Sequence, residues 1–420
     1  MFIDSIELEN VRTFAAKKKV DFVHSDTIFD SKLPKPKLTN INLLFGGNAT
    51  GKTTILEAIA LTTMGPTVVE SRVSPRPLVR FAPNARNPTE LEKSKVGWMR
   101  ATLTLHGKET RIPRDDPDGE QNAVLTVRQK GELESLEPVQ SEDTHWERAY
   151  SSNDDFFVVA YGATRRIEQK LDWNFSRKKS RFERANRIES VILEGCPLIP
   201  LKSWFAARRS KERRSEIIDL INSVQGKGHF EFNGDRRKGD GDFVFTKGGL
   251  DIPFSSLSDG YRGFLGWTTD LICRLDSACT DSKKSLREMS GIVLVDEIDL
   301  HLHPEWQLRV IANLCQAFPR LQFIVTSHSP LIAGSVEWMN IVHLKLDSLH
   351  RTGVVNFQQP IHGLDADQIL VSDLFGLQST RADAKRDELH DLTIQARRGD
   401  DEAAKRLISA MAKGLEAKKK

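Results

Sequence analysis

The sequence has few cysteines, and their distribution narrows the classes of protein to consider. Four of the 420 residues are cysteine, and they are scattered without a CxxC pair. A disulfide scaffold and a zinc site are therefore not expected. The pattern is typical of buried or half-buried thiols in a reducing compartment, at Cys196, Cys273, Cys279 and Cys315.

Long apolar runs and a strong charge imbalance are also missing. No stretch approaches the roughly 18 apolar residues of a membrane span. The opening "MFIDSIELENVRTF" has acids where a secretory signal needs a basic flank and an apolar core. We therefore expect a cytoplasmic protein without membrane contact. The 61 basic and 58 acidic residues give a net charge of +3, which neither demands nor excludes nucleic acid.

The character of the sequence changes along the chain and predicts four parts. Residues 1–164 alternate strands and turns, with a strand, a Gly-rich turn and a helix at 38–63. Residues 165–250 are basic and helix-prone and end in a hairpin around "GDRRKGDGD". Residues 251–345 alternate buried strands with helices, and residues 346–420 give a strand followed by helices. No heptad array is present, which excludes a long coiled-coil arm.

Individual elements within these parts can also be placed. Residues 66–95, rich in Pro, Arg and Asn, are expected to form a loop. Helices are expected at 262–278 and around 304–318.

A phosphate-binding loop is the strongest motif. "GGNATGKTT" matches GxxxxGK[ST], and it lies between a buried strand and a helix, as such a loop requires. Backbone N–H groups and the helix start would cradle phosphate. Lys52 is expected to reach the β- and γ-phosphates of ATP, and Thr53 to offer its hydroxyl to Mg²⁺. The expected nucleotide contacts here are Gly46, Gly47, Asn48, Ala49, Thr50, Gly51, Lys52, Thr53 and Thr54.

A second motif, "GIVLVDEIDLHLHP", places acids at the end of a buried strand. Asp296 follows four apolar residues and would emerge where doubly wound sheets bind ligands, so it is a second candidate for Mg²⁺. Glu297 beside it suits a general base for an attacking water. A strand that ends in acids by chance is the alternative, and the neighbouring phosphate loop argues against it.

Two further stretches are ambiguous on their own. His328 ends the buried strand "FIVTSH"; a lone histidine is usually structural, but here it can point at a γ-phosphate. "SLSDGYRG" has the composition of a helix start, capped by Ser258 or Asp259, with Gly260 fitting a tight entry. The residues alone do not decide between a cap and a binding surface.

Taken in order, "GGNATGKTT", "SLSDGYRG", "GIVLVDEIDLHLHP" and "IVTSHSP" resemble the ATP-binding-cassette (ABC) superfamily. The resemblance is to its soluble branch of RecF-like, Rad50-like and OLD-type ATPases. "DEIDLHLHPEWQ" and "TSHSPLI" are particularly similar to Septu-type (PtuA-like) ATPases of bacterial anti-phage defence. The resemblance is strong over residues 1–65 and 250–345. It implies an α/β fold: an ABC-type nucleotide-binding domain with a phosphate-loop mixed sheet, an antiparallel β subdomain, a helical insert and a C-terminal helical segment.

The resemblance implies that "SLSDGYRG" carries a signature that caps ATP bound by a second subunit. Ser258 and the backbone at Gly260 would contact the partner's γ-phosphate. Asp259 and Tyr261 depart from the family's usual glycine and glutamine, and Asp259 is expected to cap its own helix or contact the partner's backbone. The whole signature is Leu257, Ser258, Asp259, Gly260 and Tyr261.

Other roles implied by the resemblance are less specific. Arg12 stands where Rad50-like proteins place a basic residue near the nucleotide, and Asp299 matches the aspartate of the D-loop. For the Q-loop, Gln169 is a weak candidate, and Arg165 or Arg166 could equally be the coupling residues.

The assembly and partners follow from the same resemblance. One phosphate loop and one signature per chain predict a head-to-tail homodimer, or an oligomer of such dimers, closed by ATP. OLD-type proteins continue into a nuclease domain, for which the residues after His328 are too few. We therefore expect a separate nuclease, of the HNH type as in Septu-like systems, docked on the C-terminal helices.

Contact with DNA is an open alternative. The basic insert could bind phosphates without sequence specificity. Its interleaved acids equally fit a solvated helical surface. The candidate residues are Arg165, Arg166, Arg177, Lys178, Lys179, Arg208, Arg209 and Lys211.

Three functions compete at this point. They are a slow defence ATPase that senses infection or DNA structure and controls a nuclease, a RecF-like repair factor, and a transporter ATPase. The form "DEIDLHLHP" and the missing membrane-coupling signature argue against the transporter.

Overall fold

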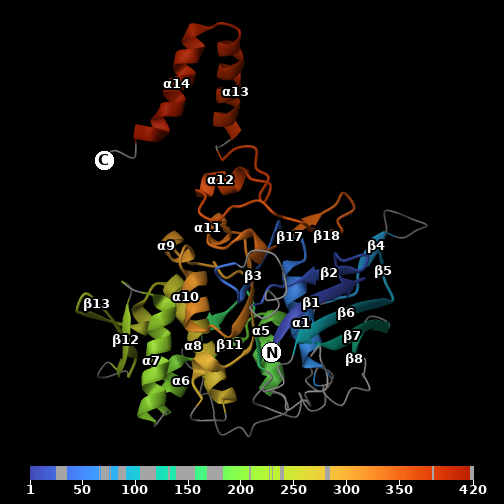
Figure 1. Cartoon of the computed structure of the whole chain (residues 1–420), viewed down its shortest axis with the longest axis vertical. Helices are drawn as coiled ribbons and strands as arrows, with labels where there is room; N and C mark the ends of the chain where they lie inside the picture. The colour runs from blue at the N-terminus through green and yellow to red at the C-terminus, as the bar shows by residue number, and fades with distance from the viewer. Residues whose placement is uncertain are drawn as a thin grey trace. The chain divides into compact units, whose positions relative to one another are not determined.

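The structure, a computed structural model, consists of two compact units, Met1–Gly363 and Leu364–Lys420 (Figure 1). The first unit contains both segments in which the ATPase motifs are found. The structure describes residues 1–24, 36–65, 67, 75, 77–83, 91–104, 120–130, 133–138, 157–167, 183–207, 210–226, 228, 230–236, 241–279, 284–380 and 383–416.

A six-stranded sheet forms the centre of the first unit. Five of its strands are parallel, and the edge strand β18 runs antiparallel to β17. Strands β3, β9, β15 and β16 are buried along their whole length, which explains why they read as continuous apolar runs. The strand order is β18 (Thr352–Val355), β17 (Ile341–Leu346), β3 (Ile41–Gly46), β16 (Leu321–Ser327), β15 (Gly291–Val295) and β9 (Val158–Tyr161).

A five-stranded antiparallel sheet is the expected β subdomain. Helix α1 (Lys52–Met64) packs between this sheet and the six-stranded sheet, and twelve of its thirteen residues are buried. The α/β fold with a mixed sheet and a separate antiparallel sheet is therefore confirmed. The five strands, in spatial order, are β2 (Lys18–Asp21), β1 (Phe2–Glu9), β6 (Val96–Thr104), β7 (Glu120–Lys130) and β8 (Leu133–Pro138).

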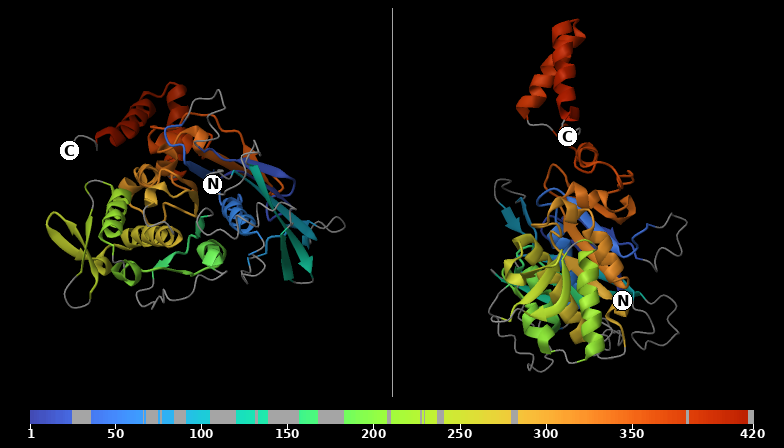
Figure 2. Two further views of the ribbon diagram at one scale, coloured as in Figure 1. Left: turned by 60° about the horizontal axis from the view of Figure 1, so that its bottom comes forward. Right: turned by 90° about the vertical axis from the view of Figure 1, so that its left-hand side faces the viewer.

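Helices and a small sheet lie on the opposite side of the six-stranded sheet from this subdomain (Figures 1 and 2). Helix α7 (Lys211–Gln225) packs against α8 (Asp259–Ala278) and α10 (Val310–Ala317). A three-stranded sheet then joins α7 through β12. Its strands are β12 (Glu231–Arg236), β13 (Phe243–Lys247) and β14 (Leu250–Pro253).

Short elements complete the first unit. Helix α5 (Glu183–Ile192) packs on β9 and α1. The remainder are β4 (Phe81–Pro83), β5 (Leu91–Lys93), β10 (Arg166–Ile167), β11 (Pro197–Leu198), α6 (Leu201–Trp204), α9 (Pro304–Gln307), α11 (Pro330–Gly334) and the 3-10 turns η2 (Phe205–Ala207), η3 (Phe254–Ser256), η4 (Leu286–Glu288) and η5 (Trp338–Asn340).

Three expected elements differ from the structure. The single helix expected around 304–318 is two helices, α9 and α10, because Arg309 leaves helical geometry with φ −120°. The loop expected at 66–95 contains the β4–β5 pair, whose strands of three residues are too short to give a periodic signal. The helix expected from 262 begins at Asp259, directly after Ser258.

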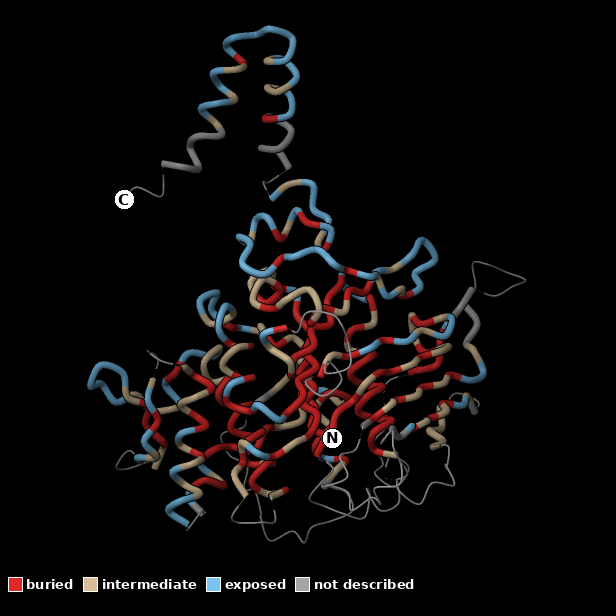
Figure 3. The backbone as a smooth tube through the Cα atoms, in the orientation of Figure 1, coloured by how far each residue is buried: buried red, intermediate tan, exposed pale blue. Residues whose placement is uncertain are grey.

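The second unit is helical, as expected for the C-terminal segment. It contains α12 (Ala366–Val371), α13 (Asp383–Arg397) and α14 (Asp401–Glu416), and α13 packs against α14. Leu389 and Ala403 are buried, but Ile394 is 37% and Ile408 67% exposed, and Figure 3 shows how much of this unit is exposed. Among the described helices of the chain, none has the length and apolar character to cross a membrane.

Candidate nucleotide-binding site

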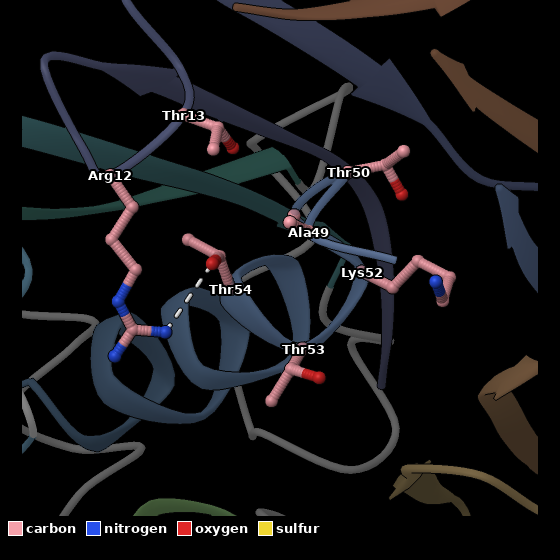
Figure 4. A pocket seen from close by; sticks show the side chains of 8 residues that line it. Arg12, Thr13, Ala49, Thr50, Lys52, Thr53 and Thr54 are labelled. Carbon is pink, nitrogen blue, oxygen red and sulfur yellow. Dashed lines mark hydrogen bonds between the residues drawn. The ribbon is translucent and has the colours of Figure 1, made fainter. Parts of the chain in front are cut away.

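The phosphate loop joins β3 to α1 and lines a pocket with Arg12 and Thr13 (Figure 4). Gly51 precedes α1 with φ +91°, and a Cβ there would lie 2.7 Å from the ring of Phe14. Only glycine fits this position without strain, because the backbone is left-handed and the ring occupies the space. The sequence pattern thus produces the turn that brings backbone N–H groups to the start of α1.

Lys52 is the buried cation of this loop. Its Nζ donates to the carbonyl oxygens of Gly46 at 2.9 Å and Gly47 at 2.8 Å. Burial lowers the pKa of its amine, and the charges of Asp296 and Glu297 oppose that effect. The ammonium group is therefore held across the loop that would cradle phosphate.

Asp296 connects the phosphate loop to its neighbouring strands. Its Oδ2 accepts a hydrogen bond from Thr53 Oγ1 at 2.9 Å, and its Oδ1 accepts one from Thr326 Oγ1 at 2.6 Å. Strand β16, which carries Thr326, lies between β3 and β15 and so brings the three residues together. A hydroxyl and a carboxylate are the hard oxygen donors that suit Mg²⁺, so the residues present fit that ion.

The backbone of Glu297 has an unusual conformation, and both its N–H and its carbonyl group are hydrogen-bonded. Its φ is +46°, in the left-handed region. Its N–H donates to Thr326 Oγ1 at 2.7 Å, and its carbonyl oxygen accepts from Arg165 Nη2 at 2.8 Å. Thr326 and Arg165 were not predicted to hold the acidic motif, although Thr326 stands two residues before His328 at the end of the same buried strand.

Arg12 forms one wall of the pocket, with its guanidinium lying over the first turns of α1 (Figure 4). Nη1 donates to Thr54 Oγ1 at 3.3 Å, and Nη2 forms an ion pair with Glu57 Oε2 at 2.6 Å. Nε donates to the carbonyl oxygen of Pro77 at 3.1 Å. The residue expected near the nucleotide therefore does line the phosphate-loop pocket.

His328 follows β16 at the same edge of the sheet and is exposed. The part of its ring that is covered lowers its pKa, and the nearby charge of Lys52 lowers it further. The imidazole is accordingly neutral at pH 7 and is available as a hydrogen-bonding group.

The predicted signature lies at the start of α8, and its capping differs from the expectation. Ser258 is the N-cap residue and is exposed, but its side chain makes no capping hydrogen bond. Asp259 does not cap the helix either: it is already inside the first turn and pairs with Arg262 one turn along. Leu257 is buried and fixes the segment to the core.

Gly260 and Tyr261 hold the start of α8 against its own chain. A Cβ at Gly260 would lie 2.1 Å from the carbonyl oxygen of His301, so this close approach requires glycine. The Tyr261 hydroxyl donates to Gln225 Oε1 at 2.5 Å and accepts from the N–H of Phe230 at 3.3 Å. Tyr261 therefore ties α8 to the end of α7, a contact that the signature motif did not predict.

Of the residues expected to face DNA, the structure describes Arg165, Arg166 and Lys211. Arg165 is a correction, because its guanidinium points into the chain and contacts Glu297. Lys211 is exposed at the start of α7, and the backbone of Arg166 lies in β10. Outside the described residues lie the Q-loop candidate Gln169 and also Arg177, Lys178, Lys179, Arg208 and Arg209.

Known protein families match the segments that form this site. The family described as "AAA domain" matches residues 5–227, more than half of the chain. The chain belongs to this family. A second AAA domain family, whose description includes "Type IV TA system", matches residues 201–334.

Three curated proteins are similar to this chain in sequence. The Septu protein PtuA of Bacillus mycoides is 24% identical, over 91% of this chain and 46% of that protein. The "Retron Ec83 probable ATPase" of Escherichia coli is 39% identical, over 25% of this chain and 19% of that protein. The DNA replication and repair protein RecF of Streptococcus pneumoniae is 24% identical, over 78% of this chain and 93% of that protein.

These matches confirm the resemblance to soluble ABC-type ATPases and to Septu proteins. The chain spans less than half the length of the Septu protein of Bacillus mycoides, and its match to the retron ATPase covers about a fifth of that protein.

Proposed function

We propose that this chain is an ATPase of a bacterial anti-phage defence system, and that its nucleotide state controls a separate nuclease of the HNH type. One observation carries the ATPase assignment. Lys52, Thr53, Asp296 and Glu297 meet at the carboxyl ends of two strands of one sheet, and Asp296 bonds Thr53 directly. The similarity to a Septu protein over 91% of the chain supports the defence role.

Binding would use the phosphate loop and the acidic strand together. Lys52 and the backbone N–H groups of residues 47–53 would hold the β- and γ-phosphates. Arg12, which lies over Thr54, would reach the phosphate nearer the ribose. Thr53 and Asp296 would hold Mg²⁺, which neutralises phosphate charge when it is bound.

Hydrolysis would use Glu297 as the general base. Its carboxylate would take a proton from the water that attacks the γ-phosphorus, while the bond from that phosphorus to the bridging oxygen breaks and leaves ADP. His328, neutral and exposed at the same edge, would contact the γ-phosphate. Asp299, the proposed D-loop residue, would cross to the partner subunit.

The working site would need two chains. Each copy has one phosphate loop and one signature, and Ser258 is exposed at the start of α8. A head-to-tail pair around a two-fold axis would place Ser258 of each copy on the other's ATP and complete both sites at once. Hydrolysis would remove the γ-phosphate contacts and open the pair, within a homodimer or an oligomer of dimers.

The nuclease would dock on the second unit. Ile394 and Ile408 are exposed there, and a pair of helices with few buried residues leaves apolar surface for a partner. DNA contact by exposed basic residues such as Lys211 would then bring substrate to the complex.

A test of the two-chain site uses two defective variants. Lys52→Ala should abolish phosphate binding, and Ser258→Arg should block the signature. Each variant alone should lack ATPase activity. A mixture should recover part of it, because one site of a mixed pair combines an intact phosphate loop from one chain with an intact signature from the other. Absence of recovery, with a mixed dimer demonstrated by mass, would refute the composite site.

RecF-like repair is the second candidate function. The alignment with RecF of Streptococcus pneumoniae, which covers 93% of that protein, favours it. Co-purification of the chain with the products of adjacent genes separates the two functions. An HNH nuclease bound in stoichiometric amounts supports defence, and a bound replication or repair factor supports the RecF-like role.

A further inference from the structure

Arg165 lies next to the acidic motif although it is 131 positions before Asp296 in the sequence (296 − 165). Its loop follows β9, and β9 pairs in parallel with β15. The segments that follow these two strands therefore lie at the same edge of the sheet. Arg165 Nη2 donates to the carbonyl oxygen of Glu297 at 2.8 Å. Its guanidinium carbon also lies 5.9 Å from the centre of the Trp267 ring, within reach of a cation–π interaction.

The electrostatics of Arg165 are unusual for a structural residue. Burial lowers its pKa to about 10, against the opposing charges of Asp296, Glu297 and Asp299. It is therefore still charged at neutral pH. Among the described residues, Arg165 Nη1 and Asp299 Oδ1 are buried without a hydrogen-bond partner. Native proteins seldom leave such groups unpaired, and those that persist often mark functional positions.

The residue that Arg165 contacts is itself in a costly conformation. Glu297 has φ +46°, and non-glycine residues keep such geometry only when their surroundings impose it. Thr326 bonds the N–H of Glu297, and Arg165 bonds its carbonyl oxygen. Removal of either contact frees one end of this residue and lets its carboxylate move.

The aromatic ring that Arg165 contacts, Trp267, lies on α8. Trp267 is 1% exposed and stands on α8 about two turns after the predicted signature. The Tyr161 hydroxyl donates to Asp270 Oδ2 at 2.7 Å, which fixes the same stretch of α8 to β9. Trp267 and Asp270 thus connect α8 to Arg165 and to β9 through packed side chains.

We propose that Arg165 is a positioning residue that couples the signature helix α8, through Trp267, to the carboxylate of Glu297. The inference rests on the proposed ATPase function. Arg165 would not touch ATP. It would hold Glu297 in its left-handed conformation when α8 is in place, and release it when α8 moves.

Kinetics of Arg165→Met and Arg165→Lys test this proposal. Methionine keeps the volume and removes every donor, so kcat should fall about tenfold or more while KM for ATP stays within twofold. Lysine keeps the positive charge, but its ammonium group is not planar and cannot both donate to Glu297 and stack on Trp267. It should therefore recover only part of the rate. A rise in KM with unchanged kcat would overturn the proposal, because it would mean that Arg165 binds nucleotide.

A double-mutant cycle tests the coupling to α8. Trp267→Leu should lower kcat less than Arg165→Met does, and the double variant should be no slower than Arg165→Met alone, because both changes break one path. Multiplicative losses would overturn the coupling. Melting temperatures of all variants separate folding defects from rate defects.

Arg214 provides a matched control. Its guanidinium carbon lies 4.3 Å from the centre of the Phe205 ring, and its Nη1 donates to the carbonyl oxygen of Phe205 at 3.3 Å. Arg214→Met thus removes the same kinds of contact, here made to Phe205 and not to a residue of the ATP motifs, and kcat should not change. An active wild type with an equally active Arg165→Met overturns this inference alone. A wild type without ATPase activity overturns the proposed function as well.

Discussion

Thr326→Val should weaken both the fold and the ATPase site, because one buried hydroxyl serves two partners. Thr326 is fully buried. It donates to Asp296 Oδ1 at 2.6 Å and accepts from the N–H of Glu297 at 2.7 Å. Valine has nearly the same shape and fills the same space, so the substitution removes the hydrogen bonds and leaves the packing intact.

The expected magnitude follows from the two bonds. A hydrogen bond to a charged group contributes about 1.5–3 kcal/mol and a neutral one about 0.5–1.5 kcal/mol. Their joint loss should lower the free energy of unfolding by about 2–4.5 kcal/mol. Thr326→Ser is the control: it keeps the hydroxyl and loses one buried methyl group, which costs about 1 kcal/mol.

Urea denaturation and steady-state ATPase assays check this reasoning. The midpoint of unfolding should fall more for valine than for serine at a similar m-value. The valine variant should also lose most of its kcat, because Asp296 and Glu297 both become less constrained. If the two variants are equally stable and equally active, Thr326 does not organise the acidic motif and the argument is wrong.

Three further substitutions give distinct results. Gly260→Ala should destabilise the chain and lower the ATPase rate, because its Cβ would lie 2.1 Å from the carbonyl oxygen of His301; circular dichroism melting and rate assays check this, and a neutral effect would contradict the close approach. Tyr261→Phe should lower the free energy of unfolding by about 1–3 kcal/mol through two lost hydrogen bonds, measured by urea denaturation, and an unchanged midpoint would contradict the tie between α8 and α7. Lys52→Met should raise the pKa of His328, because burial and then the Lys52 charge hold that pKa below its ordinary value near 6.5. An NMR titration of the imidazole measures this pKa, and no change would refute the proximity of Lys52 and His328.

The sequence was sufficient to predict the α/β fold and where the phosphate loop forms. Gly51, Lys52 and Thr53 are consecutive, so strand, turn and helix start are decided by local geometry. Asp296 could be placed at a strand end for the same reason, since four apolar residues precede it. Short-range patterns of this kind depend little on the rest of the chain.

The contacts between motifs could not be predicted, because they depend on the order of strands in space. Asp296 accepts hydrogen bonds from both Thr53 and Thr326 only because β16 lies between β3 and β15. Arg165 meets Glu297 only because β9 pairs with β15. Neither neighbour relation can be read from the linear order of the motifs.

The helix cap expected at Ser258 or Asp259 is also wrong. Ser258 and Asp259 have the composition of a helix cap, but Arg262 takes the Asp259 carboxylate and the Ser258 hydroxyl makes no capping bond. Elsewhere in the chain, Ser210 and Ser329 do cap their helices through their side chains. Capping propensity states what a residue can do, and at Asp259 a neighbouring arginine takes the carboxylate instead.

The segment around the acidic motif gives up stability in several ways at once. Glu297 and His301 both have left-handed backbones, and Asp299 Oδ1 is buried without a partner among the described residues. Sites of strain and unpaired burial persist only if the surrounding fold imposes them, and they gather where geometry matters more than stability. Contacts from β16, from the loop after β9 and from the start of α8 converge on these few residues. A loop supported from three sides in this way can respond to a change in any one of them, as the proposed nucleotide-dependent switch would require.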